Sequence, residues 1–325
     1  MGRNRLSKRS IVLLVLAALI LLAPLVFPSS FYYRIGALIF INGLAVTGLV
    51  ILVGYAGQIS LGHAGFVGIG AYSSAIGPAH LGLPPVPSLV AGAAISGFIA
   101  WVVGRPILRL RGHYLAVVTL GFGFLIAMVL SNEVAWTGGP DGMMVEGLGL
   151  KGLLRDMGLS LKTSEMWYWL AGLVLLLGAW IGLNLHHSPT GRALRSLHDS
   201  EVAARVIGVN VPQYKLHAFV ISAVYASLAG SLFALFNRFV TPDVAGFMHS
   251  VELVTMTVLG GAGTVMGGIV GAGLLTSLPQ ALTVFHEYEH IMLGLIMMGV
   301  MIFKPEGLLP GLVKLFEGLM SRRTK

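Results

Sequence analysis

The chain has 325 residues, of which 56% are hydrophobic and only 10% are charged, and its mean hydropathy is +0.85. Soluble domains carry about 25% charged residues, so this composition excludes an ordinary water-soluble domain and indicates an all-α polytopic membrane protein. Basic residues placed around membrane spans explain the net charge of +8 better than nucleic-acid binding does. The absence of cysteine excludes disulfides, thiolate metal sites and a cysteine nucleophile.

The N-terminal segment combines four basic residues with the apolar run Ile11–Phe27. A signal peptide has similar features, but this run is long and no A-x-A cleavage pattern follows it. We therefore expect a first transmembrane helix with a cytoplasmic N-terminus. Nine further apolar runs bring the expected number of helices to about ten, and the third and the eighth are candidates for broken or re-entrant helices. These nine runs are 36–53, 60–78, 86–103, 113–130, 167–185, 216–236, 248–260, 265–284 and 287–303.

The distribution of basic residues gives the expected topology. If the chain starts inside, the cytoplasmic segments hold 16 of the 21 Lys and Arg residues and the external segments hold five. This excess agrees with the positive-inside rule. Both termini are then cytoplasmic, and we expect residues 1–325 to form one transmembrane domain. The main external loop is 131–166, in which the sequence WTGGPDG has the composition of a tight turn.

The longest polar segment between two apolar runs is the loop 186–215, on the predicted cytoplasmic side. Within it, Ser200 can cap a short helix and Gly208 can end that helix. Asn210 can then begin the next helix through a capping box with the glutamine three residues later. The pattern predicts a short isolated helix, Glu201–Ile207. Its alanines allow close approach to another surface, so it either docks a soluble partner or lies on lipid.

Polar residues at membrane depth are costly unless they line a wet path or find partners. Gln58, Ser60 and His63 occur in the Gly-rich sequence GYAGQISLGHAGF, and they form a candidate translocation path. Hydrogen bonding between helices is the alternative explanation. Glu252 lies a few residues inside a predicted span and joins this candidate path. Because Glu252 is near the outer end of its span, it could instead reach the interface or pair with Arg238.

Two motifs point to other chemistry. His286-Glu287-Tyr288-Glu289-His290 matches the H-E-x-x-H pattern of zinc proteases. We expect these residues to form an exposed turn, and we expect no metal and no cofactor. Gly261-x-Gly263 lacks the strand–turn–helix context of a dinucleotide site. No Gly-Lys pair occurs in the chain, so it has no phosphate-binding loop of its own.

Five blocks of sequence occur in order along the chain. They are GYAGQISLGHAGFVGIGAY (54–72), RLRGHYLAVVTLGFG (109–123), TGGPDG (137–142), SEVAARVIGVNVPQYKLHAFVISA (200–223) and VLGGAGTVMGG (258–268). Together they resemble the branched-chain amino acid ABC-transporter permeases, over about residues 35 to 310. Several blocks that match in order are far more specific than any single motif considered above.

The resemblance implies a multi-pass permease of the bacterial inner membrane, with no enzymatic activity of its own. It implies a heterodimer with a second permease subunit, two cytoplasmic ATP-hydrolysing subunits and an extracytoplasmic substrate-binding protein. It also implies that the 186–215 loop contains a coupling helix resembling the general E-A-A…G pattern, to which the match is degenerate because Val202 intervenes. The corresponding positions are Glu201, Ala203, Ala204, Arg205 and Gly208.

Other functions remain compatible with the residues. Urea and short-chain amide permeases share the same blocks, so the resemblance leaves the substrate open. An ion-coupled secondary transporter would use Glu252 or His63 as its coupling site. An intramembrane zinc protease would use His286, Glu287 and His290.

Overall fold

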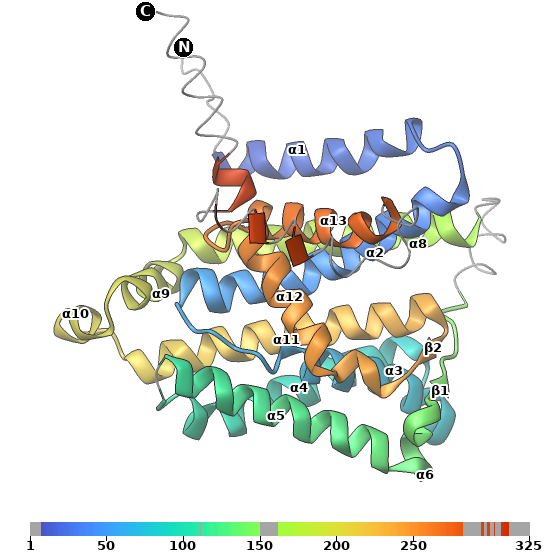
Figure 1. Cartoon of the computed structure of the whole chain (residues 1–325), viewed down its shortest axis with the longest axis horizontal. Helices are drawn as coiled ribbons and strands as arrows, with labels where there is room; N and C mark the ends of the chain where they lie inside the picture. Colours follow the sequence, from blue (N-terminus) through green and yellow to red (C-terminus); the bar gives the residue numbers. More distant parts are fainter. Residues whose placement is uncertain are drawn as a thin grey trace, which may run out of the picture.

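The computed structural model describes residues 8–110, 112–149 and 162–281, with the short pieces 294–295, 298–299, 302 and 307–311. The described part is almost entirely helical, and its long helices lie side by side along one direction (Figure 1). The predicted helix 287–303 lies mostly outside the described residues. The HEYEH sequence at 286–290 lies wholly outside them.

The helices follow the predicted apolar runs. The first half contains α1 (Lys8–Leu22), α2 (Ser30–Leu49, continued by a π-helical turn Val50–Tyr55), α3 (His63–Leu81), α4 (Pro85–Ile107), α5 (His113–Asn132) and α6 (Val134–Thr137). The second half contains α8 (Thr163–His187), α9 (Pro189–Asp199), α10 (Glu201–Val206), α11 (Val211–Asn237), α12 (Phe247–Gly260) and α13 (Val265–Ala281). Two short strands, β1 (Met143–Met144) and β2 (Phe239–Val240), pair antiparallel, with Met143 opposite Val240.

Five of the described helices are long and apolar enough to cross a bilayer, and three shorter apolar helices accompany them. A span of about 20 residues covers the hydrocarbon thickness. The most apolar stretches of α2 and α11 are 72% and 67% buried, whereas those of α4 and α5 are 28% buried. The prediction of an all-α polytopic membrane protein is confirmed. Its centre is formed by α2 and α11, and α4 and α5 lie at its periphery.

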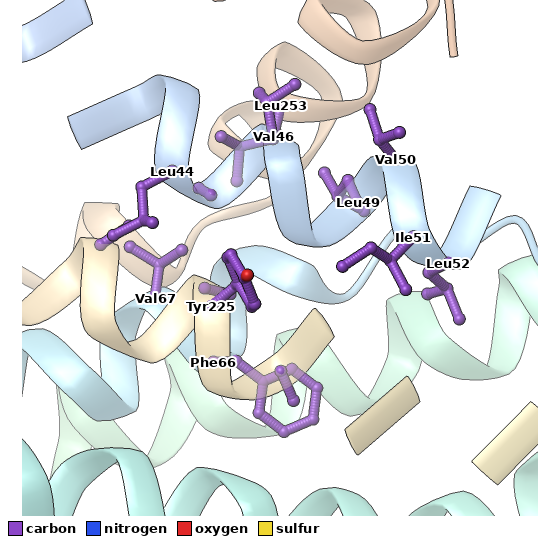
Figure 2. Packing of buried hydrophobic residues seen from close by; sticks show 14 of the residues in the cluster. Leu44, Val46, Leu49, Val50, Ile51, Leu52, Phe66, Val67, Tyr225 and Leu253 are labelled. Atoms are coloured by element: carbon purple, nitrogen blue, oxygen red, sulfur yellow. The ribbon is translucent and has the colours of Figure 1, made fainter. Parts of the chain in front are cut away.

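Glycines let the central helices approach closely. A Cβ on Gly70 of α3 would overlap the Ser227 carbonyl of α11, and a Cβ on Gly230 would overlap the Val67 carbonyl of α3. Small residues at helix contacts are the usual device for close packing in a membrane. Figure 2 shows the side chains around this contact, including Phe66 and Val67 of α3 and Tyr225 of α11. The α3–α11 pair is therefore fixed by backbone contact.

The two ends of the bundle have different elements. At one end α9 and α10 project beyond the long helices, and at the other lie α6 and the β1–β2 pair (Figure 1). Four residues at and just after the end of α4 line one cavity with residues of α10 and α11; they are Gly104, Arg105, Leu108 and Arg109. The predicted cytoplasmic segments 104–112 and 186–215 thus meet at the same end. This arrangement is the one that the charge distribution predicts.

Two local predictions were wrong. The predicted span 60–78 begins as a helix only at His63, and residues 56–62 are irregular. The loop 186–215 was expected to contain one short helix, but it contains α9 as well as α10. Ser188 caps α9 by accepting a hydrogen bond from the Gly191 N–H at 3.1 Å, and proline follows at the first helical position.

Candidate functional site

The capped helix α10 has the ends that its sequence predicts. The Ser200 side chain accepts a hydrogen bond from the Ala203 N–H at 3.3 Å, and α10 ends at Val206, one residue earlier than expected. Gly208 follows in the left-handed region, with φ of +86°. The Asn210 side chain accepts a hydrogen bond from the Gln213 N–H at 3.4 Å and begins α11. These caps separate α10 from both neighbouring helices.

One side of α10 is attached to the protein and the other is exposed. Ala204 is completely buried, and the Glu201 carboxylate forms an ion pair with Lys215 of α11. The Lys215 side chain is itself buried. This pair therefore joins α10 to the second turn of α11, and removing the carboxylate would leave the buried Lys215 ammonium group uncompensated.

The exposed side of α10 is apolar. Val202, Val206 and Ile207 are 67%, 83% and 71% exposed. We call these three residues the apolar face of α10. Three large aliphatic side chains on a short projecting helix are more exposed than folding of this chain alone favours. Such a patch marks an interaction surface.

α9 connects α10 to the interior of the bundle. Its Leu194 and Leu197 are buried, and its His198 packs against Gly57 in the irregular segment after α2. A Cβ on Gly57 would lie 3.2 Å from His198 Nδ1, and Gly57 has φ of +64°. Glycine is therefore needed there for both space and conformation. α9 consequently touches the first residues of the segment 56–62.

The segment 56–62 runs from α9 to the middle of α5 in an irregular conformation. The Leu61 N–H donates to Thr119 Oγ1 at 3.1 Å, and the Ala64 N–H, at the start of α3, donates to Ser250 Oγ at 3.0 Å. Gly62 packs against the Thr119 carbonyl. Irregular backbone at membrane depth needs such partners because lipid provides none. The Thr119 side chain of α5 supplies one for the segment, and Ser250 of α12 supplies one for the first turn of α3.

His63 lies at the end of this segment and is completely buried. Its Nδ1 is 2.9 Å from Ser60 Oγ, and its Nε2 is 2.7 Å from Ser222 Oγ on α11. The imidazole ring also packs edge-on against Phe66 and Phe219. A neutral imidazole has one donor and one acceptor nitrogen, and two hydroxyl groups can satisfy both. We call His63, Ser60 and Ser222 the His63 cluster.

The other predicted path residues are arranged differently. Gln58 is 5% exposed, and its Nε2 donates to the Ala56 carbonyl at 3.1 Å. The structure brings Ser60 and His63 together but gives Glu252 different partners. The Glu252 side chain is 55% exposed, and its Oε2 lies 3.3 Å from His249 Nδ1. No hydrogen bond or ion pair among the described residues joins Glu252 to Arg238 or to the His63 cluster.

Glu252 instead lines a cavity of about 470 Å³ near β2, at the end opposite α10. Phe233, Asn237 and Thr241 also line this cavity. Sequence reasoning missed Ser222, Thr119 and Ser250 as functional candidates. A single hydroxyl residue in an apolar helix gives no signal of its own.

Metal binding has no support in the described part of the chain. No group of three or more His, Asp or Glu residues lies close enough there to hold a metal ion. His286, Glu287 and His290 lie outside the described residues, so the structure leaves the predicted zinc motif untested.

Comparison with known proteins gives one consistent family. The sequence model described as "Branched-chain amino acid transport system / permease component" matches residues 32–301. Over 286 residues the chain is 37% identical to the high-affinity branched-chain amino acid transport system permease protein LivM of Escherichia coli (strain K12). That alignment covers 81% of this chain and 66% of LivM, so the chain spans slightly less than two thirds of that relative.

Two further relatives are more distant. The chain is 25% identical over 281 residues to LivH, a permease protein of the same E. coli transport system, covering 82% of this chain and 90% of LivH. It is 27% identical over 246 residues to the autoinducer 2 import system permease protein LsrC of Yersinia pseudotuberculosis (serotype O:3, strain YPIII). That alignment covers 66% of this chain and 68% of LsrC. No solved structure matches the chain.

Proposed function

The chain belongs to the family of branched-chain amino acid transport permease components, and we propose that it is a membrane-spanning subunit of an ATP-driven importer of branched-chain amino acids. The substrate proposal rests on the similarity to LivM and LivH, whose names give that substrate class. LsrC, named for autoinducer 2 import, is a more distant relative. The bacterial inner membrane is the compartment that fits such an importer.

The same comparison supports a proposal for the partners. E. coli has two permease proteins, LivM and LivH, named for one transport system, and this chain resembles both. A second permease subunit is therefore the expected membrane partner. The chain contains no phosphate-binding loop, so two cytoplasmic subunits would hydrolyse ATP. An extracytoplasmic binding protein would deliver substrate to the end that carries α6 and the β1–β2 pair.

The observation that carries the proposal is the apolar face of α10. Val202, Val206 and Ile207 project at the basic end of the bundle, and Ala204 and the Glu201–Lys215 ion pair attach the opposite side of the helix to the permease. A groove on an ATP-hydrolysing subunit would cover the three aliphatic side chains. Because α10 is attached to α11 through Lys215, a displacement of α10 would be transmitted to α11.

The translocation path would pass the His63 cluster. In the described conformation Gln58, Ser60 and His63 are each at most 5% exposed, so this part of the path is closed. Because His63 bonds to Ser222 of α11, movement of α11 away from α3 would break this contact and uncover several dipoles. A branched aliphatic amino acid has an apolar body and two opposite charges. A mostly apolar path with a few dipoles suits that chemistry, and Glu252 would lie at its outer end.

The direct test is Val206→Asp. A carboxylate in a covered apolar interface costs several kcal/mol, so uptake driven by ATP should fall by at least about tenfold. Val206 is 83% exposed in the isolated chain, and insertion and thermal stability should therefore be unchanged. The assay is uptake of radiolabelled leucine by proteoliposomes that contain the complete transporter.

The matched control is Val86→Asp. Val86 is 58% exposed and lies in the first turn of α4, at the other end of the bundle, where an acidic group suits the helix N-terminus. This variant should transport normally. Normal uptake by Val206→Asp would contradict α10 docking. Uptake by the chain alone under an ion gradient, with no ATP-hydrolysing subunit, would favour the secondary-transporter alternative.

A further inference from the structure

A second site lies beside α10, on the side away from its apolar face. It is a cavity of about 630 Å³ between the end of α4, α10 and the start of α11. Arg105 and Arg109 of the α4 end, Arg205 of α10, and the pair Glu201 and Lys215 are among the residues that line it. The function proposed above uses the Glu201–Lys215 ion pair at the edge of this cavity, but it gives no role to Arg105 or Arg109 or to the space between them.

The cavity is strongly basic. Lys215 forms an ion pair with Glu201, whereas Arg105, Arg109 and Arg205 are exposed and form no ion pair within the described residues. Three guanidinium groups therefore line one cavity, and they come from the last turn of α4, from the turn that follows it and from α10. The planar fork of arginine suits phosphate oxygens better than a lysine ammonium group does.

The first turn of α11 adds to the positive potential in the cavity. Asn210, Val211, Pro212 and Gln213 line the cavity, and α11 is 27 residues long. The N-terminus of a long helix carries a partial positive charge and favours anions. The arginines and the helix N-terminus that line the cavity therefore both favour a negatively charged ligand.

An apolar surface leads away from the cavity along α4. Phe98, Trp101 and Val102 are 65%, 42% and 45% exposed, and Trp101 also lines the cavity. The Arg105 guanidinium lies over the Trp101 ring at 3.7 Å. Tryptophan beside a basic residue at a helix end is typical of the membrane–water interface. A ligand with both a phosphate and acyl chains would fit this surface along its whole length, whereas free phosphate would use only the cavity.

We propose that this cavity binds the phosphate headgroup of an anionic phospholipid from the cytoplasmic leaflet, with the acyl chains lying along α4. Basic pockets between membrane helices at the cytoplasmic side bind such headgroups. Through Arg205 the bound lipid would connect α10 to the end of α4. The inference rests on the membrane topology and does not depend on the transported substrate.

The experiment is lipid binding to the purified full-length chain, measured by native mass spectrometry with phosphatidylglycerol and phosphatidylcholine. Each arginine near an anionic surface contributes about 1 kcal/mol, or about fivefold. The double variant Arg105→Gln/Arg109→Gln should therefore bind phosphatidylglycerol about 25-fold more weakly. Phosphatidylcholine binding should be weak in all variants.

The matched control is Arg192→Gln/Arg195→Gln, which removes two exposed arginines of α9 outside the cavity. It should bind phosphatidylglycerol like the unmodified chain. Thermal unfolding should be the same in both double variants, because all four residues are exposed.

Four outcomes would overturn the proposal. The first is an unchanged affinity for phosphatidylglycerol in the cavity variant, and the second is an equal loss in the α9 control. The third is displacement of the lipid by millimolar inorganic phosphate, which would identify a site for free phosphate. A cavity variant that retains lipid but no longer binds the ATP-hydrolysing subunit would assign the arginines to a protein contact and would also overturn the proposal.

Discussion

The two polar regions of this molecule stabilise it by different means. The His63 cluster is buried, and within the described residues it holds no ion pair, only hydrogen bonds among an imidazole and two hydroxyl groups. The α10 end is charged, partly exposed and built around the Glu201–Lys215 ion pair. Neutral groups satisfy each other within the membrane at small cost, whereas charges need access to the interface.

Both regions are attached to α11. Lys215 and Ser222 are seven residues apart, which is two helical turns or about 10 Å along the axis. They therefore lie on one face of α11, and the helix can transmit a displacement of α10 to the His63 cluster. We propose that these two attachments on α11 couple α10 to the His63 cluster. Each of the following substitutions perturbs one part of the molecule, and they are given from the largest expected effect to the smallest.

Gly230→Ala should have the largest effect, which is a loss of stability at the contact between α3 and α11. The added Cβ would overlap the Val67 carbonyl, so α3 and α11 must separate, at a cost of about 3 kcal/mol. Chemical unfolding in detergent micelles measures this change. Gly121→Ala on α5, where nothing lies within 4 Å of the new Cβ, is the control and should be neutral. An equal loss of stability in both variants would mean that the close approach is unimportant.

Lys215→Met should destabilise the α10 end of the molecule by removing the ion pair between α10 and α11. It removes the buried ammonium group from its ion pair with Glu201, and the expected loss is about 1 to 3 kcal/mol because the Glu201 side chain is 21% exposed. Adding Glu201→Gln should recover most of the stability but not the uptake, because α10 would no longer be fastened to α11. Recovery of uptake by the double variant would show that the ion pair has no role in coupling.

Ser222→Ala should weaken the His63 cluster moderately. It leaves the buried Nε2 of His63 without its hydroxyl partner, which costs about 1 to 2 kcal/mol. Ser131→Ala is the control, because Ser131 donates only to the Ala127 carbonyl in its own helix, and its effect should be small. Calorimetry of both variants in the same detergent compares them, and equal melting temperatures would contradict the structural importance of the cluster.

Ser200→Ala should have the smallest effect. It removes the N-cap of α10, worth about 1 kcal/mol or less at this exposed site. Ser200→Asp keeps a capping oxygen and should behave like the unmodified chain. Hydrogen exchange of the α10 amides measures the difference, and equal exchange in the two variants would mean that the cap does not define α10.

The sequence predicted much of the fold because the signals were local. Long apolar runs marked the spans, the family resemblance is confirmed, and Ser200, Gly208 and Asn210 marked the ends around α10. The start of α3 was predicted three residues too early, at position 60 and not at His63, because no local signal separates residues 60–62 from the helix that follows. The segment bonds to Thr119 and the first turn of α3 bonds to Ser250, and both partners are distant in sequence.

The candidate site was predicted only in part for the same reason. Ser60 and His63 are neighbours in sequence, and their proximity was visible, whereas Ser222 is 159 residues from His63. α9 was missed because its polar face dominates its sequence, although Ser188 followed by proline is a start signal for a helix. Glu252 was expected to pair with Arg238, but its partner is His249, one turn away in the same helix. Sequence alone did not favour this neighbour because histidine carries no fixed charge.

The most direct test of coupling through α11 is the accessibility of position 222 during transport. The chain has no cysteine, so Ser222→Cys introduces a single thiol at a site that is completely buried. In the complete transporter this thiol should resist a water-soluble maleimide without ATP and react during ATP turnover. It should resist again when Val206→Asp is added. A thiol that reacts equally with and without ATP, or that still responds to ATP when Val206→Asp is present, would contradict the account.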